Sequence, residues 1–256
     1  MNQLTFQISK FNWIGCFLLL ITVASYGQED LNELTVDRPG IADTPYTVPV
    51  GLWQAEIGFD YFSRYNGDHF HLPTALIRTG ISRRSEFRIS TVHVIDKTEP
   101  NRFQGISPLL LGLKMHIIKK KKWVPETDLM VNISLPLHFG SGYSAKPGPE
   151  MLLLFENDFS NKLAINYNLG MLWDSFRGSR ILEYSVCFNY LPTHRVGLFA
   201  EAFGYSPLQD AVETGMDGGM TYLLLPNWQL DLSAGLSTIN GQLNHFVSTG
   251  FTVRFK

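Results

Sequence analysis

The feature that most constrains the fold of this chain is an alternation of apolar and polar residues with a period of two. In the run from Trp53 to Tyr61, every second residue is apolar or aromatic, and the residues between them are polar or glycine. Because successive side chains of a strand point to opposite faces, such a run predicts a β-strand with one apolar face. About twelve runs of this kind follow one another, at residues 53–61, 74–82, 86–91, 111–117, 128–135, 150–158, 163–171, 182–190, 196–205, 217–224, 228–234 and 247–255.

A soluble β-sandwich and a membrane β-barrel both carry this alternation, so the connections must distinguish them. Short connections that alternate with long ones are typical of an up-and-down barrel with short periplasmic turns and longer outside loops. We therefore predict an all-β fold, a closed up-and-down antiparallel transmembrane β-barrel of about 12 strands over residues 52–256. The short connections are expected at 83–84, 161, 192–194 and 225–226, and the long ones at 63–70, 95–108, 138–149, 174–180 and 206–215.

Aromatic residues make up 13% of the chain, and many lie near the predicted strand ends. Amphipathic rings favour the interface between bilayer and water, so we expect these residues to form two girdles facing lipid. The aromatic preference for strands in general is the competing explanation. The girdle candidates are Trp53, Tyr61, Trp123, Trp173, Tyr190, Tyr205, Trp228 and Phe255.

Residues 1–27 have the composition of a cleaved export signal. Lys10 provides a positive start, Trp13 to Val23 is an uncharged apolar core, and the small residues Ser25 and Gly27 suit the cleavage site. The core is shorter than the roughly 20 residues that a membrane-spanning helix needs, and no later window reaches that length without a charge. We therefore expect export to the outer membrane of a Gram-negative bacterium, where strands contact the outer-membrane lipid.

The charge of the chain argues against nucleic-acid binding, and the spacing of its histidines gives no support for catalysis. Charged residues are 17% of the chain and the net charge is −2, so no basic surface for a nucleic acid is expected. None of the seven histidines lies at a spacing from Ser or Cys that suggests an activated nucleophile. His69 and His71 could line a metal-binding loop with Asp68, but no further ligands are identifiable, so we expect no metal and no cofactor.

Residues 28–51 form an irregular N-terminal segment, because three prolines interrupt a stretch with no sustained periodicity. We hypothesise that this segment enters the lumen as a plug. Asp37, Arg38 and Pro39 are the plug candidates, with Asp37 and Arg38 paired to charges of the wall. The competing interpretation is a loose periplasmic tail.

The polar rows of the predicted strands would line the lumen. Such groups can select and guide solutes, or they can pair with one another and fill the interior. Glycines on the same rows suggest close approach of another backbone or a tight bend. The lumen-lining candidates are Glu56, Asp60, Arg78, Glu86, Arg88, Lys114, His116, Glu183, Glu201, Asp231 and Arg254, with Asp128, Glu150 and Glu156 on the same rows. The glycines are Gly58, Gly80, Gly112, Gly170, Gly219, Gly235 and Gly250.

One stretch resembles a known family. Asp37-Arg38-Pro39-Gly40 is followed by Thr44-Pro45, Val48-Pro49 and the strand from Trp53 to Gly58, a pattern similar to the MetA-pathway of phenol degradation family. The motif covers about two dozen residues, and the rest of the chain matches in length and strand rhythm. The resemblance implies an outer-membrane barrel and the passage of a small molecule, with hydrophobic or aromatic solutes as one option. It identifies no substrate and no catalytic residues.

The sequence thus predicts a non-enzymatic, porin-like channel or transporter for a small-molecule solute. A non-conducting structural or adhesive barrel is the alternative, and a periplasmic β-rich binding protein is a third. Phe255, one residue from the end, resembles the C-terminal signature that the outer-membrane assembly machinery reads, although Lys256 departs from it.

Overall fold

The computed structural model describes residues 34–65, 67–97, 103–136, 139–140, 146–175, 177–208 and 210–256. The predicted export signal, residues 1–27, lies outside the described residues, as do residues 28–33 of the predicted N-terminal segment. Within the described ranges, no helix is long and apolar enough to cross a membrane.

Strands make up almost all of the described chain after residue 52. Apart from the short β4 and β7, twelve strands form the wall of one closed antiparallel barrel. The bounds are β1 (Trp53–Arg64), β2 (Gly67–Ser82), β3 (Ser85–Asp96), β4 (Phe103–Ile106), β5 (Leu109–Ile118), β6 (Glu126–Leu135), β7 (Phe139–Gly140), β8 (Gly148–Ser160), β9 (Leu163–Trp173), β10 (Arg180–Tyr190), β11 (Val196–Pro207), β12 (Glu213–Leu225), β13 (Trp228–Ile239) and β14 (Gln242–Phe255).

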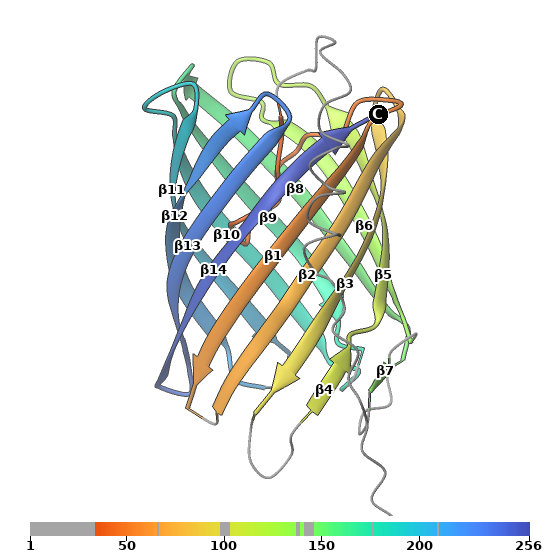
Figure 1. Ribbon diagram of the computed structural model, residues 1–256, viewed down its shortest axis with the longest axis vertical. Coiled ribbons are helices and arrows are strands. Elements are labelled where there is room, and N and C mark those ends of the chain that lie inside the picture. Colours follow the sequence, from red (N-terminus) through yellow and green to blue (C-terminus); the bar gives the residue numbers. More distant parts are fainter. Residues whose placement is uncertain are drawn as a thin grey trace, which may run out of the picture.

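The sheet closes where the first and last wall strands meet. β1 pairs antiparallel with β14, so that Trp53 lies opposite Phe255 and Gly58 lies opposite Gly250. Every wall strand also pairs with its neighbours along the chain, and the strands tilt around the barrel axis (Figure 1). Closure leaves no free strand edge, and every wall strand then has a backbone partner on both sides. The predicted closed barrel of about twelve strands is confirmed.

The two ends of the barrel differ in their connections. At one end, which we call the short-turn end, β1 begins, β14 finishes, and turns such as 83–84, 161–162 and 226–227 join the strands. The other end carries longer connections, including 174–179 and 208–212, and we call it the long-loop end.

One predicted long connection is wrong. Residues 63–70 were expected to form an outside loop, but β1 continues to Arg64 and β2 begins at Gly67. Rings hold the extended hairpin together, since Tyr61 and Phe70 lie 5.1 Å apart and Phe62 and His71 lie 4.8 Å apart between ring centroids. Cross-strand aromatic pairs of this kind stabilise continued pairing.

The two faces of the wall have opposite chemistry. Outward side chains are apolar and exposed, as expected of a surface that meets hydrocarbon. Inward side chains are mostly polar and buried, apart from an apolar patch of Met130, Leu152 and Leu154. Tyr205 departs from the predicted girdle, because it shares the inward face of β11 with Glu201. Exposed outward residues include Leu113, Val131, Ile133, Met151, Leu169, Val186, Phe188, Leu198, Leu230 and Leu232.

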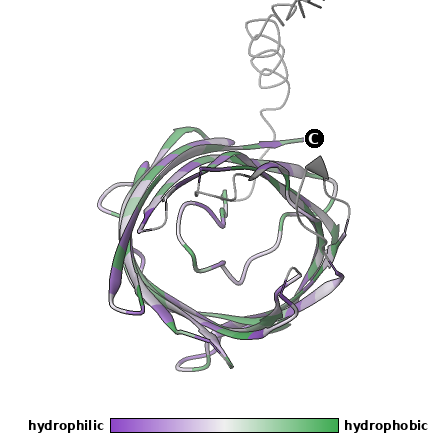
Figure 2. Ribbon diagram, turned by 90° about the horizontal axis from the view of Figure 1, so that it is seen from below, coloured by the Kyte–Doolittle hydropathy of each residue, from purple (hydrophilic) through white to green (hydrophobic). Residues whose placement is uncertain are grey.

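Residues 34–51 lie inside the ring of strands (Figure 2). They form no named strand, and their one backbone bridge joins Val50 to Gly80 of β2. Val48 is completely buried against the wall. A Cβ at Gly80 would lie only 2.2 Å from the carbonyl oxygen of Val48, so the missing side chain admits the segment to the wall. We call residues 34–51 the interior segment.

Candidate functional site in the barrel interior

Asp37 of the interior segment is the centre of a buried network of charges. Its Oδ2 accepts hydrogen bonds from Arg88 Nη1 at 2.8 Å and from Lys114 Nζ at 2.9 Å, and lies 3.2 Å from Arg78 Nη1. Its Oδ1 accepts from the backbone N–H and the hydroxyl of Thr44, at 3.0 and 2.9 Å. The three cations come from β2, β3 and β5, so one carboxylate joins three neighbouring strands.

Two wall carboxylates complete the network. Arg78 donates to both oxygens of Glu86, at 2.9 and 3.0 Å, and to Glu56 Oε1 at 2.8 Å. The same two carboxylates hold the interior segment, because Glu56 Oε2 accepts from the backbone N–H groups of Asp37 and Arg38 and Glu86 Oε2 also accepts from that of Val48. We call Asp37, Glu56, Arg78, Glu86, Arg88 and Lys114 the Asp37 network.

Pairing of opposite charges explains why the Asp37 network can be buried. Its three carboxylates face its three cations, Asp43 also accepts a hydrogen bond from Arg88 Nη2 at 3.2 Å, and Arg78, Lys114 and Glu86 are each completely buried. Buried ions are tolerated when they are paired and hydrogen-bonded, whereas removing one partner typically costs about 3–5 kcal/mol. Burial alone raises the pKa of Asp37, but the neighbouring Arg78, Lys114 and Arg88 outweigh it and hold that pKa well below its usual range.

Arg38 occupies a second site, formed by two glycines that lie opposite each other. A Cβ at Gly58 would lie 1.9 Å from Arg38 Nη1, and a Cβ at Gly250 would lie 2.7 Å from its Nε. In this slot the guanidinium donates to Asp231 Oδ1 at 3.1 Å and to Ser248 Oγ at 2.8 Å. The slot therefore requires glycine on both strands, and it binds a cation of the interior segment.

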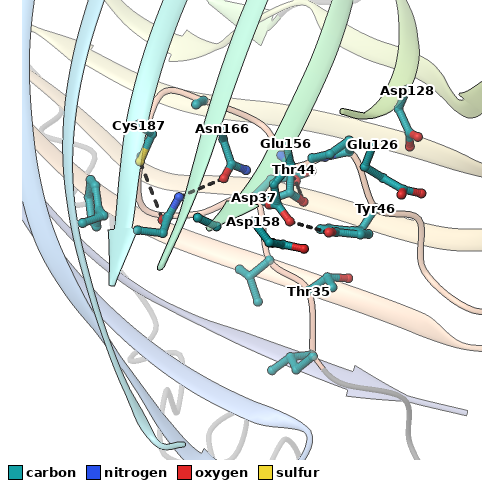
Figure 3. Close-up of a pocket in the computed structure, with 18 of the residues that line it drawn as sticks. Thr35, Asp37, Thr44, Tyr46, Glu126, Asp128, Glu156, Asp158, Asn166 and Cys187 are labelled. Atoms are coloured by element: carbon teal, nitrogen blue, oxygen red, sulfur yellow. Dashed lines mark hydrogen bonds between the residues drawn. The ribbon is translucent and has the colours of Figure 1, made fainter. Parts of the chain in front are cut away.

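Other contacts attach the interior segment to the opposite wall. Glu201 of β11 accepts the backbone N–H groups of Ile41 and Ala42, both at 2.7 Å. Tyr46 donates its hydroxyl proton to Glu156 of β8, and the two side chains face each other in Figure 3. Together with the networks around Asp37 and Arg38, these contacts attach the interior segment to both sides of the lumen.

A cavity of about 980 Å³ lies between the interior segment and the wall. Its lining includes Tyr46, Asn166 and Cys187 (Figure 3). It continues to Pro39 of the interior segment and to residues of the short turns such as Asn161. The lining is mixed, with several carboxylates and lysines, so this space holds water and polar solutes readily.

The structure brings most of the predicted lumen-lining residues together around the interior segment. Asp60 accepts from Ser248 at 2.6 Å and lies 3.8 Å from Arg38, and Arg254 donates to Gln54 at 2.9 Å. His116 lies apart, near the short-turn end, where its Nδ1 is 2.9 Å from Asp128 Oδ1.

Glu183 is not a member of the Asp37 network; it lies buried on the inward face of β10. The predictions did not include Thr44, Tyr46 or Gln54, which carry contacts of the interior segment. Only the polarity of these residues could have suggested such a role.

In the part of the chain that the structure describes, no group of three or more His, Cys, Asp or Glu residues is arranged to hold a metal ion. His69 instead lies 3.4 Å from Asp96, and His71 packs on Phe62. The single cysteine of the described chain, Cys187, is buried on the inner wall.

Comparison with known proteins agrees with this architecture. The family model described as "Putative MetA-pathway of phenol degradation" matches residues 36–255. The chain is similar in structure to the COG4313 outer membrane channel from Pseudomonas putida F1, with 11% identity and a TM-score of 0.63 over 85% of this chain and 99% of that one. No curated protein sequence matches the chain.

Two further structures share the fold. The NanC porin has 10% identity and a TM-score of 0.56 over 79% of this chain and 99% of that one. The translocator domain of the autotransporter NalP from Neisseria meningitidis has 13% identity and a TM-score of 0.54, over 81% of this chain and 89% of that one. At such identities the likeness shows the fold alone.

Proposed function

Because the chain belongs to the family described as "Putative MetA-pathway of phenol degradation" and closes into a twelve-stranded barrel, we propose that it is an outer-membrane channel for small solutes in a Gram-negative bacterium. In this proposal the interior segment is a plug that narrows the passage, and Asp37 and Arg38 are its anchors. The observation that carries the proposal is the set of ionic contacts between the segment and the wall.

The chemistry of the contacts supports a segment that stays in place yet leaves room for solutes. Charged hydrogen bonds tie it to β1, β2, β3 and β5, where the Asp37 network fills the lumen. On the side of β8 to β10 the contacts are fewer, and these strands line the cavity of about 980 Å³ together with the short-turn ends of β5 and β6. A solute would therefore pass along β8 to β10, beside the plug rather than through the Asp37 network.

The same burial favours a second candidate, a non-conducting barrel with a structural or adhesive role. A completely paired interior would need no passage, and the Asp37 network is of that kind. In both candidates we expect the N-terminal export signal to be cleaved and the outer-membrane assembly machinery to insert the barrel.

Solute flux into liposomes distinguishes the two candidates. The mature chain would be refolded into phosphatidylcholine liposomes, with insertion checked by heat-modifiable migration on a gel. Swelling in small sugars and amino acids, above the rate of protein-free liposomes, is the result expected of a channel. Inserted barrels without swelling, both with and without residues 28–49, would exclude the channel and leave the structural role.

A further inference from the structure

The turn between β5 and β6 combines positive charge with an exposed aromatic ring at the short-turn end. Residues 119–122 are four consecutive lysines, and Trp123 and Val124 follow them. We call residues 119–124 the basic turn. All six residues are exposed, and Trp123 is 89% exposed. Tryptophan is highly buried on average in proteins, so an exposed one beside other apolar side chains indicates a contact surface.

The basic turn has a defined backbone shape. Lys121 and Val124 exchange two backbone hydrogen bonds, of 3.1 and 3.0 Å, so Lys122 and Trp123 form the tip of a tight hairpin. Lys122 adopts a positive φ of 56°, a conformation common in tight turns. The tip therefore presents an ammonium group and an indole ring on adjacent residues.

Only one of the lysines near the tip is neutralised by the barrel. The ammonium group of Lys120 pairs with Asp158 of β8, and its backbone N–H donates to Glu126 at 2.9 Å. Among the described residues, Lys121 and Lys122 form no ion pair. Lys120 thus attaches the basic turn to the wall, and the next two lysines leave their positive charges available to another molecule.

Asn157 of β8 shows on which side of the wall the tip lies. Its Nδ2 donates to the carbonyl oxygen of Trp123 at 3.3 Å, and its Oδ1 accepts from the hydroxyl of Tyr167 at 3.1 Å. Glu156 is buried on the inward row of β8, so alternation directs Asn157 outward. The main chain of Trp123 therefore lies against the outer side of the barrel.

The basic turn continues the apolar outer surface of the wall. β5 ends in the exposed Ile117 and Ile118, and Phe159 of β8 is exposed at the same end of the barrel. Aromatic rings at the ends of barrel strands favour the boundary between hydrocarbon and lipid headgroups. A ring of Trp123 at this boundary would place the neighbouring lysines among the phosphate groups.

We propose that the basic turn binds an anionic phospholipid of the periplasmic leaflet, with Trp123 at the headgroup boundary and Lys121 and Lys122 on the phosphate. Short turns of such barrels face the periplasm, and lysines close to a membrane surface are attracted to anionic lipid. A protein partner fits less well, because the apolar part of the surface is continuous with the lipid-facing wall. The inference concerns the outer surface and holds whether or not the lumen conducts.

Native mass spectrometry of the refolded mature chain in detergent tests the proposal, with phosphatidylglycerol as the anionic probe and phosphatidylcholine as the neutral one. We expect the intact chain to bind phosphatidylglycerol more tightly. Lys121→Gln combined with Lys122→Gln should weaken that binding roughly fivefold for each lysine removed, and should change the binding of phosphatidylcholine little. Lys97→Gln combined with Lys146→Gln removes two exposed lysines at the long-loop end and is the matched control.

Trp123→Gln separates the ring from the charges. We expect it to weaken the binding of both lipids by a similar factor, because the ring acts on either headgroup. Inorganic phosphate should not displace phosphatidylglycerol, and displacement would mean a site for free anions instead of lipid. Equal affinity of the intact chain and the double lysine variant for phosphatidylglycerol would overturn the proposal and leave the basic turn to solvent or to a protein partner. Heat-modifiable migration checks that each variant is folded.

Discussion

At the scale of single residues, the interior is organised around two side chains of one short motif. Asp37 and Arg38 are adjacent in sequence, yet they point to different parts of the wall. Asp37 joins the cations of β2, β3 and β5, and Arg38 reaches the carboxylate of β13. One dipeptide of opposite charges thereby attaches the segment to two separate parts of the barrel.

Asp37→Asn should loosen the interior segment. The substitution keeps the shape of the side chain but removes the negative charge that pairs with Arg78, Arg88 and Lys114, a change that costs about 3–5 kcal/mol at a buried pair. Chymotrypsin should then cleave after Tyr46 at least ten times faster, as measured by mass spectrometry of the fragment that begins at Thr47. Asp210→Asn, which changes an exposed loop carboxylate paired with Arg177, is the control. Equal rates in Asp37→Asn and the intact chain would contradict the role of Asp37.

Gly58→Ala should displace Arg38 from its slot. The added methyl group would lie 1.9 Å from the guanidinium, which must move away from Asp231. Gly112→Ala is a matched control, because its methyl group would crowd Asn132 of the wall and not the interior segment. We expect faster cleavage after Tyr46 in Gly58→Ala alone. The same increase in both variants would mean that any crowding of the lumen loosens the segment.

At the scale of elements, the strands follow from their periodicity, and their partners do not. Lipid on one side and a polar lumen on the other impose alternation on each strand, so residues 53–61 and 247–255 could be predicted as strands from sequence. Asp37 and Lys114 are 77 residues apart, and no local pattern records that contact. The inward polar rows could therefore be predicted as a set, whereas the pairing of each charge required the three-dimensional arrangement.

The length of one hairpin and the direction of one side chain were predicted incorrectly for the same physical reason. The hairpin of β1 and β2 is longer than expected, and Tyr205 faces inward, because aromatic residues pack on one another as well as on lipid. Sequence alone distinguishes these environments poorly, since the same residue types serve in both. Gly215 and Gly235, which make space for the inward rings, were informative only once the registers were known.

The β13–β14 hairpin tests whether the backbone conformation of a tight turn contributes to the stability of the barrel. Asn240 and Gly241 both adopt positive φ, at 53° and 74°, as the tightest hairpin turns require. Gly241→Ala should destabilise the barrel by about 1 kcal/mol, whereas Gly241→Asn should cost less, because Asn tolerates this conformation. The urea midpoint of the refolded barrel measures the difference. Equal midpoints for the two variants would mean that the turn conformation does not limit stability.

At the scale of the whole molecule, the barrel combines an apolar outer wall with an interior that the chain itself partly fills. Paired charges occupy the side of β1 to β5, and a cavity of about 980 Å³ lies toward the short-turn end, lined by β8 to β10 and by the ends of β5 and β6. In the proposed channel, solutes would pass through this cavity and not through the Asp37 network.

The most direct measurement is single-channel conductance in a planar bilayer, with the mature chain and a variant lacking residues 28–49 compared side by side. We predict small discrete steps for the intact chain and steps several times larger for the variant, since removal of the segment opens the side that the Asp37 network fills. Steps of equal size would contradict a narrowing role for the interior segment. The absence of steps from both, with inserted barrels shown by heat-modifiable migration, would contradict the channel itself.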